Sequence, residues 1–137
     1  MKRSPQVAQR RRRLIAICRA LPEVHASAMG VADEHLALRV RKKTFAYYLY
    51  DHHGDGRIAL WCKAAPGEQA SLVGQDARRF FVPPYLGPKG WVGVRLDLGT
   101  VAWGEIAYLV GMAYRMSAPR ALVALLEQPT EARRKRR

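Results

Sequence analysis

The spacing of hydrophobic residues changes from a helical period to a strand period within the first half of the chain. Apolar residues recur at helical spacing from Leu14 to Leu21 and Pro22 ends the pattern, which predicts a first helix. From His35 to Lys63, apolar and polar positions alternate with a period of two. Interruptions at Lys42-Lys43 and at residues 54–56 divide this stretch and predict a meander of three strands.

The second half of the chain returns to helical and strand patterns in turn. A short helix is predicted from Pro66 to about Gly74, because proline is tolerated in the first turn of a helix. Strands are predicted at residues 80–82 and 91–96, around a loop rich in proline and glycine. A long helix with an apolar stripe from Ile106 to Met116 and a short helix at residues 120–127 follow. Apart from the last short helix, this order is α-β(3)-α-β(2)-α, and it predicts an α+β fold with an antiparallel sheet and the helices on one face.

Positive charge is concentrated at the two ends of the chain. The 137 residues suffice for one domain and carry a formal net charge of +13. Residues 1–13 hold six cations and no acid, and residues 128–137 hold five cations and one glutamate, which leaves +3 for residues 14–127. We therefore expect a basic N-terminal arm (1–13), a domain (14–127) and a basic C-terminal tail (128–137). A positive field attracts phosphate, so nucleic acid is the expected partner; solvated ends without a partner are the alternative.

The sequence predicts no metal, no cofactor and no membrane span. Cys18 and Cys62 have no second cysteine or histidine at zinc-ligand spacing, so we expect buried reduced thiols. The apolar run that follows the N-terminal arginines ends at Arg19, which is too short for a secretory signal. No apolar run approaches the roughly 20 residues of a membrane helix. The expected location is the cytoplasm.

Residues 51–56 (DHHGDG) bring carboxylates and imidazoles together, as metal sites and proton-transfer sites do. Glycine and aspartate are also the residues that a hairpin turn requires, and a turn leaves its histidines in water. We interpret the segment as a turn. The sequence also lacks a nucleophile elbow and a phosphate loop, so we expect a protein that is not an enzyme and has no catalytic residues.

One face of the predicted sheet alternates cations with aromatic rings. Cations contact phosphates, and rings stack on unpaired bases or insert into a groove. With the helices on the opposite face, this face would point outward, joined by the turn at Lys42-Lys43 and by the loop that carries Lys89. The predicted nucleic-acid-binding residues are Arg39, Arg41, Lys42, Lys43, Tyr48, Tyr50, Trp61, Lys63, Lys89, Trp91 and Arg95.

The same rings fit a second interpretation, because exposed aromatic patches mark protein interfaces in general. A protein-interaction module or a homodimer would use this face in the same way. The loop at residues 83–91 is likewise open to two interpretations. It grips phosphate through Lys89 and backbone amides, or it is a structural loop whose prolines lower its entropy and whose rings cover the core.

Several segments between the basic ends resemble the MmcQ/YjbR family. They are residues 20–24 (ALPEV), 39–47 (RVRKKTFAY), 79–94 (RFFVPPYLGPKGWVGV), Tyr114-Arg115 and Ala118-Pro119, and the resemblance covers roughly Leu14 to Leu126. It implies a two-layer fold similar to that of secretion chaperones, and a DNA-binding function, with RNA as the related alternative. The family often has glycine where Lys42 stands and aspartate where Ala102 stands. We therefore expect a different turn at Lys42 and a weaker helix N-cap, unless Thr100 provides the cap.

Overall fold

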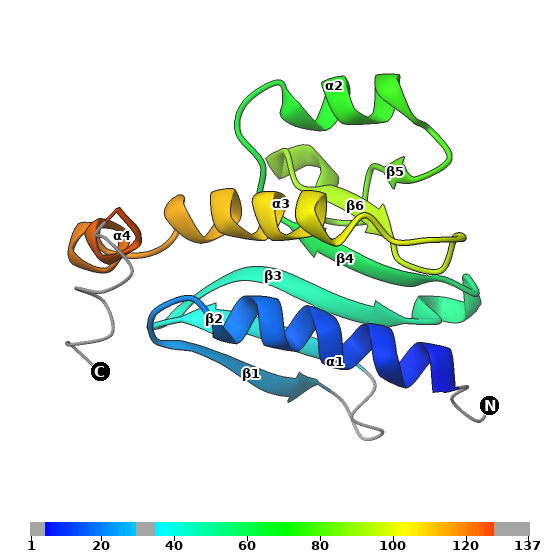
Figure 1. The fold of residues 1–137 in the computed structure, drawn as a ribbon. Coiled ribbons are helices and arrows are strands. Elements are labelled where there is room, and N and C mark those ends of the chain that lie inside the picture. The colour runs from blue at the N-terminus through cyan, green and yellow to red at the C-terminus, as the bar shows by residue number, and fades with distance from the viewer. Residues whose placement is uncertain (1–4, 30–34, 128–137) are drawn as a thin grey trace.

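The fold is built on one antiparallel sheet of six strands (Figure 1). The computed structural model describes residues 5–29 and 35–127. The predicted α+β class is confirmed, but an edge strand that the pattern did not reveal, β1, precedes the predicted meander. The strands, in spatial order β1-β2-β3-β4-β6-β5, are β1 (Val24–Met29), β2 (His35–Val40), β3 (Lys43–Tyr50), β4 (Ile58–Cys62), β5 (Phe80–Phe81) and β6 (Val92–Arg95).

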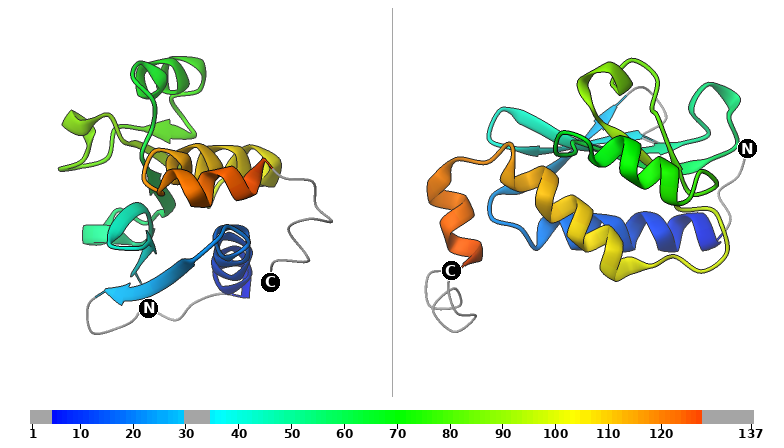
Figure 2. Two further views of the ribbon diagram at one scale, coloured as in Figure 1. Left: turned by 90° about the vertical axis from the view of Figure 1, so that its left-hand side faces the viewer. Right: turned by 90° about the horizontal axis from the view of Figure 1, so that it is seen from above.

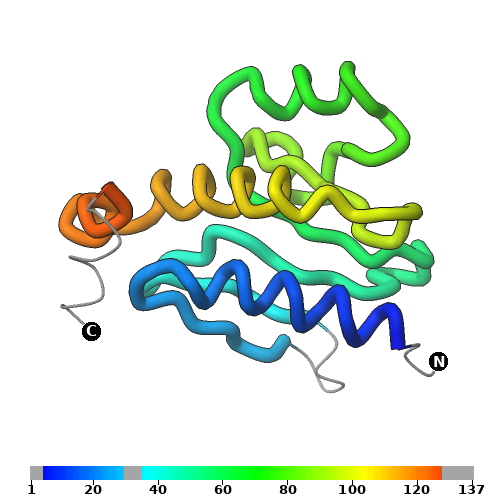
Figure 3. Tube along the Cα trace, viewed as in Figure 1, coloured from blue at the N-terminus to red at the C-terminus, as the bar shows by residue number. Residues whose placement is uncertain are grey.

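Two long helices cover one face of this sheet. Helices α1 (Pro5–Arg19) and α3 (Trp103–Arg115) lie side by side over it, and α4 (Arg120–Leu126) continues beyond the ends of the strands (Figures 1 and 2). Helix α2 (Glu68–Gln75) lies at the β5 edge, and the path of the chain between these elements is traced in Figure 3. No helix within the described ranges is long and apolar enough to cross a membrane.

The main core lies between the sheet and helices α1 and α3. Leu14 and Cys18 of α1 are fully buried there against apolar side chains of the central strands. Tyr114 of α3 packs edge-on against Phe45 with 5.8 Å between ring centroids. Its hydroxyl donates a hydrogen bond of 2.8 Å to the carbonyl of Pro22. This contact joins the end of α3 to the segment that connects α1 with β1.

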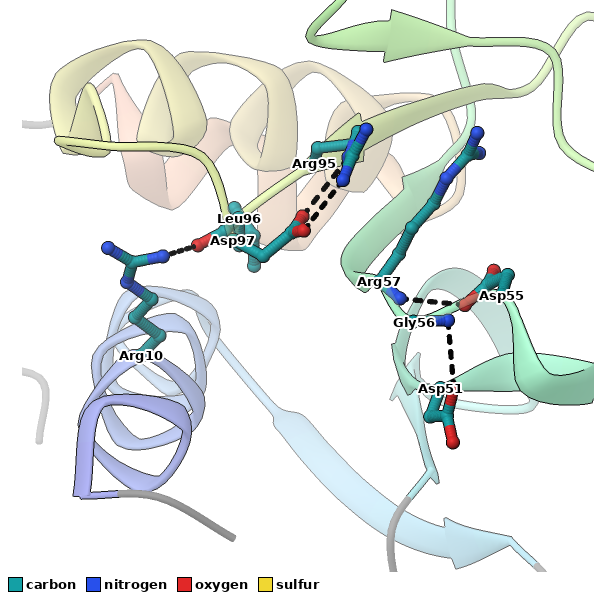
Figure 4. Close-up of polar contacts among 8 residues, drawn as sticks. All are labelled: Arg10, Asp51, Asp55, Gly56, Arg57, Arg95, Leu96 and Asp97. Atoms are coloured by element: carbon teal, nitrogen blue, oxygen red, sulfur yellow. Dashed lines mark hydrogen bonds and ion pairs between the residues drawn. The ribbon is translucent and has the colours of Figure 1, made fainter.

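Helix α1 begins well before the predicted boundary at residue 14. It starts at Pro5, and both Val7 and Arg10 are buried. The guanidinium of Arg10 donates hydrogen bonds to the carbonyl of Leu96, drawn in Figure 4, and to that of Gly99 at 2.6 Å. The expectation that residues 1–13 form an arm outside the core is therefore wrong for residues 5–13. The C-terminal tail, 128–137, lies outside the described residues.

A β-bulge in β3 changes which side chains face the helices. Leu38 is paired with Ala46 but Arg39 with Thr44, so Phe45 is an extra residue in the ladder. Phe45 and Ala46 consequently both point into the main core. Beyond the bulge the alternation is inverted relative to the predicted one, and Tyr48 and Tyr50 face the helices.

The two predicted departures from the family pattern have different outcomes. In the turn between β2 and β3, the residue with positive φ is Arg41 (φ 55°), one position before Lys42. The N-cap of α3 is Ala102, and no side chain provides a capping hydrogen bond there. Thr100 therefore does not replace the missing aspartate, and the first N–H groups of α3 lack a side-chain acceptor.

Candidate nucleic-acid interface

The outer face of the sheet, opposite the helices, is defined by the strand register. Residues paired across antiparallel strands point to the same side. One row on this face runs from Tyr47 through Trp61 and Gly93 to Phe81. The next row contains Leu49, Ala59 and Arg95. Aromatic rings and cations therefore do share this face, as predicted, but only some of the predicted residues belong to it.

Tyr48 and Tyr50 were predicted to lie on this outer face, and that prediction is wrong. Tyr48 is opposite Leu60 and Tyr50 is opposite Ile58, and all four side chains belong to the main core. The cause is the bulge at Phe45, which inserts one residue and reverses the direction of every later side chain in β3. Neither tyrosine is available to stack on a base.

The aromatic rings of the outer face are packed against one another. Trp61 is 5% exposed and Trp91 is 6% exposed, and with Leu49 and Ala59 they form a second small core. Tyr47 lies 5.6 Å from Trp91 between ring centroids, and His52 lies 5.1 Å from Trp61. A ring that stacks on a base needs an open face. In this structure the two tryptophans stabilise the outer layer and do not offer a stacking platform.

Close packing at Gly93 completes this second core. A Cβ on Gly93 would overlap the ring of Phe81, which lies across the neighbouring strand. The guanidinium of Arg57 lies over the ring of Phe81, 4.5 Å from its centroid. A larger residue at this position would therefore force the Phe81 ring to move.

Two of the predicted cations are neutralised by partners that the sequence pattern did not indicate. Arg41 forms two hydrogen bonds with the carboxylate of Glu23, at 2.6 and 3.0 Å, and lowers the pKa of that carboxyl. Arg95 contacts both oxygens of Asp97, at 3.2 and 2.8 Å (Figure 4). A paired arginine adds little to the attraction of phosphate. Arg39 lies on the outer face opposite His25 and has no ion pair among the described residues.

Three lysines from separate elements converge at one end of the sheet. Lys43 begins β3, Lys63 follows the end of β4, and Lys89 ends the short helix η2 (Gly87–Lys89). Burial lowers the pKa of Lys63, and the positive charges of Lys43 and Lys89 lower it further. Within the described ranges none of the three forms an ion pair. We call Lys43, Lys63 and Lys89 the lysine cluster; Lys42 is exposed in the adjoining turn.

The loop from Val82 to Gly90 is fixed by its own hydrogen bonds and by α2. The side-chain amide of Gln69 donates to the carbonyls of Gly87 and Trp91, at 2.9 and 2.6 Å. Within the loop, the backbone N–H groups of the four non-proline residues from Leu86 to Gly90 donate hydrogen bonds to carbonyls of the same loop. The idea that free amides of this loop grip phosphate is therefore wrong for these groups. Lys89 is the exposed cation of this loop.

The segment Asp51 to Arg57 uses its carboxylates to hold the turn (Figure 4). Asp51 accepts a hydrogen bond from the N–H of Gly56 at 2.8 Å, and Asp55 accepts one from the N–H of Arg57 at 2.9 Å. Burial lowers the pKa of His52, which packs against Trp61. Residues 5–29 and 35–127 contain no group of three or more His, Cys, Asp or Glu side chains placed to hold a metal ion. These contacts agree with the interpretation of the segment as a turn.

The two cysteines lie in the main core as free thiols. Burial raises the pKa of both Cys18 and Cys62 to about 12, and at Cys18 the proximity of Cys62 contributes. A thiol with so high a pKa is protonated at neutral pH and is a poor nucleophile or metal ligand. Both act as small apolar core residues.

Comparison with known proteins identifies the family. The sequence model of the YjbR family matches residues 19–116, and the chain belongs to this family. The crystal structure of Deinococcus radiodurans protein DR2400, described as a DUF419 domain, is similar over 85% of this chain and 86% of that chain, with a TM-score of 0.63 and 24% identity. At this identity the similarity shows the fold alone. No curated protein sequence matches the chain. The resemblance inferred from residues 20–24, 39–47 and 79–94 is thus confirmed.

Proposed function

We propose that the protein is a non-enzymatic nucleic-acid-binding protein, with DNA as its main partner, and that the lysine cluster contacts the phosphate backbone. The observation that carries the proposal is the convergence, at one end of the sheet, of three ammonium groups that form no ion pair with any described residue. Like charges held together raise the local potential, and they add to the effect of burial in lowering the pKa of Lys63. A phosphate placed between them relieves this repulsion. The DNA binding implied by the family resemblance supports the same conclusion.

Contacts of this kind position a protein on a nucleic acid without reading its sequence. The aromatic side chains of the sheet that were predicted to stack on bases are buried, so we expect backbone binding with little sequence preference. The alternative of a homodimer or protein partner on the same aromatic face is less well supported, because Trp61 and Trp91 are already buried within one chain. Light scattering of the protein alone distinguishes that alternative, since a homodimer forms without nucleic acid.

The test is a salt series with the full-length protein and a labelled DNA duplex. Each of the substitutions Lys43→Gln, Lys63→Gln and Lys89→Gln should reduce the slope of log affinity against log salt by about 0.9. Arg78→Gln removes one exposed charge outside the lysine cluster, in the segment after α2, and is the matched control. An unchanged slope in all three lysine variants, with the fold intact by circular dichroism, would show that this cluster does not contact DNA.

A further inference from the structure

The N-terminal arginine run lies on an ordered helix with one inward and one outward side. Helix α1 contains five arginines and no acidic residue. Val7, Arg10, Leu14 and Cys18 are its buried residues and lie along one side. The opposite side carries Gln9, Arg12, Ala16 and Arg19, all exposed and spaced three or four residues apart. We call these four residues the arginine ridge.

The position of this ridge is fixed by the buried side of the same helix. Arg10 ties α1 to the carbonyls of Leu96 and Gly99, at the segment that leads from β6 to α3. Arg13, beside the ridge, lies 5.6 Å from the ring centroid of Trp103 in α3. Arg12 and Arg19 are seven residues apart, which places their Cα atoms about 10 Å apart along the axis, near three base steps of one strand. The helix thus fixes the spacing of the two Cα atoms from which these cations extend.

The acidic residues of the helical layer do not neutralise this ridge. Glu23 pairs with Arg41, Glu105 with Arg79, and Glu127 with Arg115. Within the described ranges no ion pair involves Arg12, Arg13 or Arg19. A cationic surface therefore lies on the helical layer, whereas the outer face of the sheet is on the other side of the molecule (Figure 2).

The side chains of α1 distinguish among the polyanions that such a surface attracts. A helix that binds a membrane surface needs large apolar residues on its contact side, and the exposed residues of α1 are Pro, Gln, Arg and Ala. Binding to an unpaired strand uses exposed aromatic rings, which α1 also does not contain. Arg12 and Arg19 are separated on the ridge by Ala16, whose small side chain allows close approach, and this arrangement fits the regular phosphates of a duplex.

We infer that the arginine ridge of α1 is a second phosphate-binding surface, specific for the backbone of double-stranded nucleic acid. The inference rests on the proposed function and adds to it the duplex as substrate and α1 as a contacting element. Arg12 and Arg19 contact phosphates directly, and Arg10 positions the helix from its buried side.

The experiment uses the full-length protein with the double substitution Arg12→Gln/Arg19→Gln. Its matched control, Arg78→Gln/Arg120→Gln, removes the same charge from exposed positions on other elements. The charged ends of the chain are present in both, so their contribution cancels. Binding is measured by fluorescence anisotropy over a salt series with a labelled duplex, the corresponding single strand, and vesicles that contain anionic lipid. Circular dichroism melting confirms that both variants fold.

With the duplex, the slope of log affinity against log salt should decrease in magnitude by about 1.8 in the ridge variant, about 0.9 for each phosphate contact. The decrease in the control should be less than half of that. Equal slopes for the ridge variant and its control would overturn the inference, as would a larger loss with single strands or vesicles than with the duplex. A Lys63→Gln/Lys89→Gln variant separates the two proposals. If it alone loses slope, the proposed site stands and the ridge fails; if the ridge variant alone loses slope, the reverse holds.

Discussion

Arg10 is a buried arginine in a run of exposed ones, and its removal should destabilise the protein strongly. Its side chain is 8% exposed and donates to the carbonyls of Leu96 and Gly99. Substitution by Met keeps most of the aliphatic stem and removes the guanidinium. Both carbonyls then lose a charged donor, the carbonyl of Leu96 in a buried position and that of Gly99 in a partly buried one.

The expected magnitude follows from the two hydrogen bonds. A hydrogen bond to a charged group contributes about 1.5–3 kcal/mol, and the partly buried bond to Gly99 belongs in the lower part of that range. Arg10→Met should therefore lower the free energy of unfolding by about 3–5 kcal/mol. Domains of this size are stable by only about 5–15 kcal/mol, so the loss is a large fraction of the total. At about 4 °C for each kcal/mol, the melting temperature should fall by about 12–20 °C.

Urea unfolding followed by tryptophan fluorescence measures this change, and Arg12→Met is the matched control. Arg12 is two residues away on the exposed side of α1, where substitutions usually change stability by less than about 0.5 kcal/mol. The stability of Arg10→Lys should lie between that of Arg10→Met and that of the original protein, because lysine keeps the charge but cannot donate to both carbonyls with the geometry of a guanidinium. If Arg10→Met and Arg12→Met unfold at the same urea concentration, the reasoning that α1 is pinned by Arg10 is refuted.

Three further predictions concern stability. Gly93→Ala should cost about 1–3 kcal/mol because the new methyl group overlaps Phe81, whereas Gly104→Ala, with open space around it in α3, should be neutral or stabilising; thermal melts compare them. Ala102→Asp should stabilise the protein by about 1 kcal/mol by capping α3, and a lower melting temperature would argue against that N-cap. Burial lowers the pKa of His52, so below a pH of about 6.5 the unfolded state binds the proton first and the free energy of unfolding falls until the folded pKa is reached. His52→Gln should reduce the loss of unfolding free energy between pH of about 7.5 and about 5.5, which urea titrations at these two pH values measure. An equal loss in the variant and the original protein would show that the reasoning is wrong.

The sequence predicted the class of the fold and most of its elements because their patterns are strong. The apolar stripe of α3 is buried from Ile106 to Ala113, and the residues of β2 and β4 that were predicted to face inward all lie in the main core. In β3 the alternation was read correctly, but its direction depends on the bulge at Phe45, which only the pairing with β2 reveals. One inserted residue therefore moved Tyr48 and Tyr50 from the predicted interface into the core.

The candidate site was harder to predict, because charge patterns do not show which cations are paired. Glu23 and Asp97 lie outside the alternating strands, yet they neutralise Arg41 and Arg95. The arginine run was interpreted as an arm because a buried arginine looks the same in sequence as an exposed one. The spacing of Val7 with Leu14 and Cys18, seven and four residues apart, was the signal that extends the helix to the N-terminal side.

The two edges of the sheet are closed to different degrees. Strand β5 is two residues long and α2 packs against it, whereas β1 is six residues long and pairs only with β2 in the part of the chain that the structure describes. An open edge of this length offers backbone donors and acceptors to a strand of another molecule, and β1 contains neither lysine nor proline to prevent it. Mutual repulsion between copies that each carry +13 opposes this pairing. Colloidal stability in this protein is therefore tied to ionic strength: salt or a bound polyanion that screens the charge brings open edges within reach of one another.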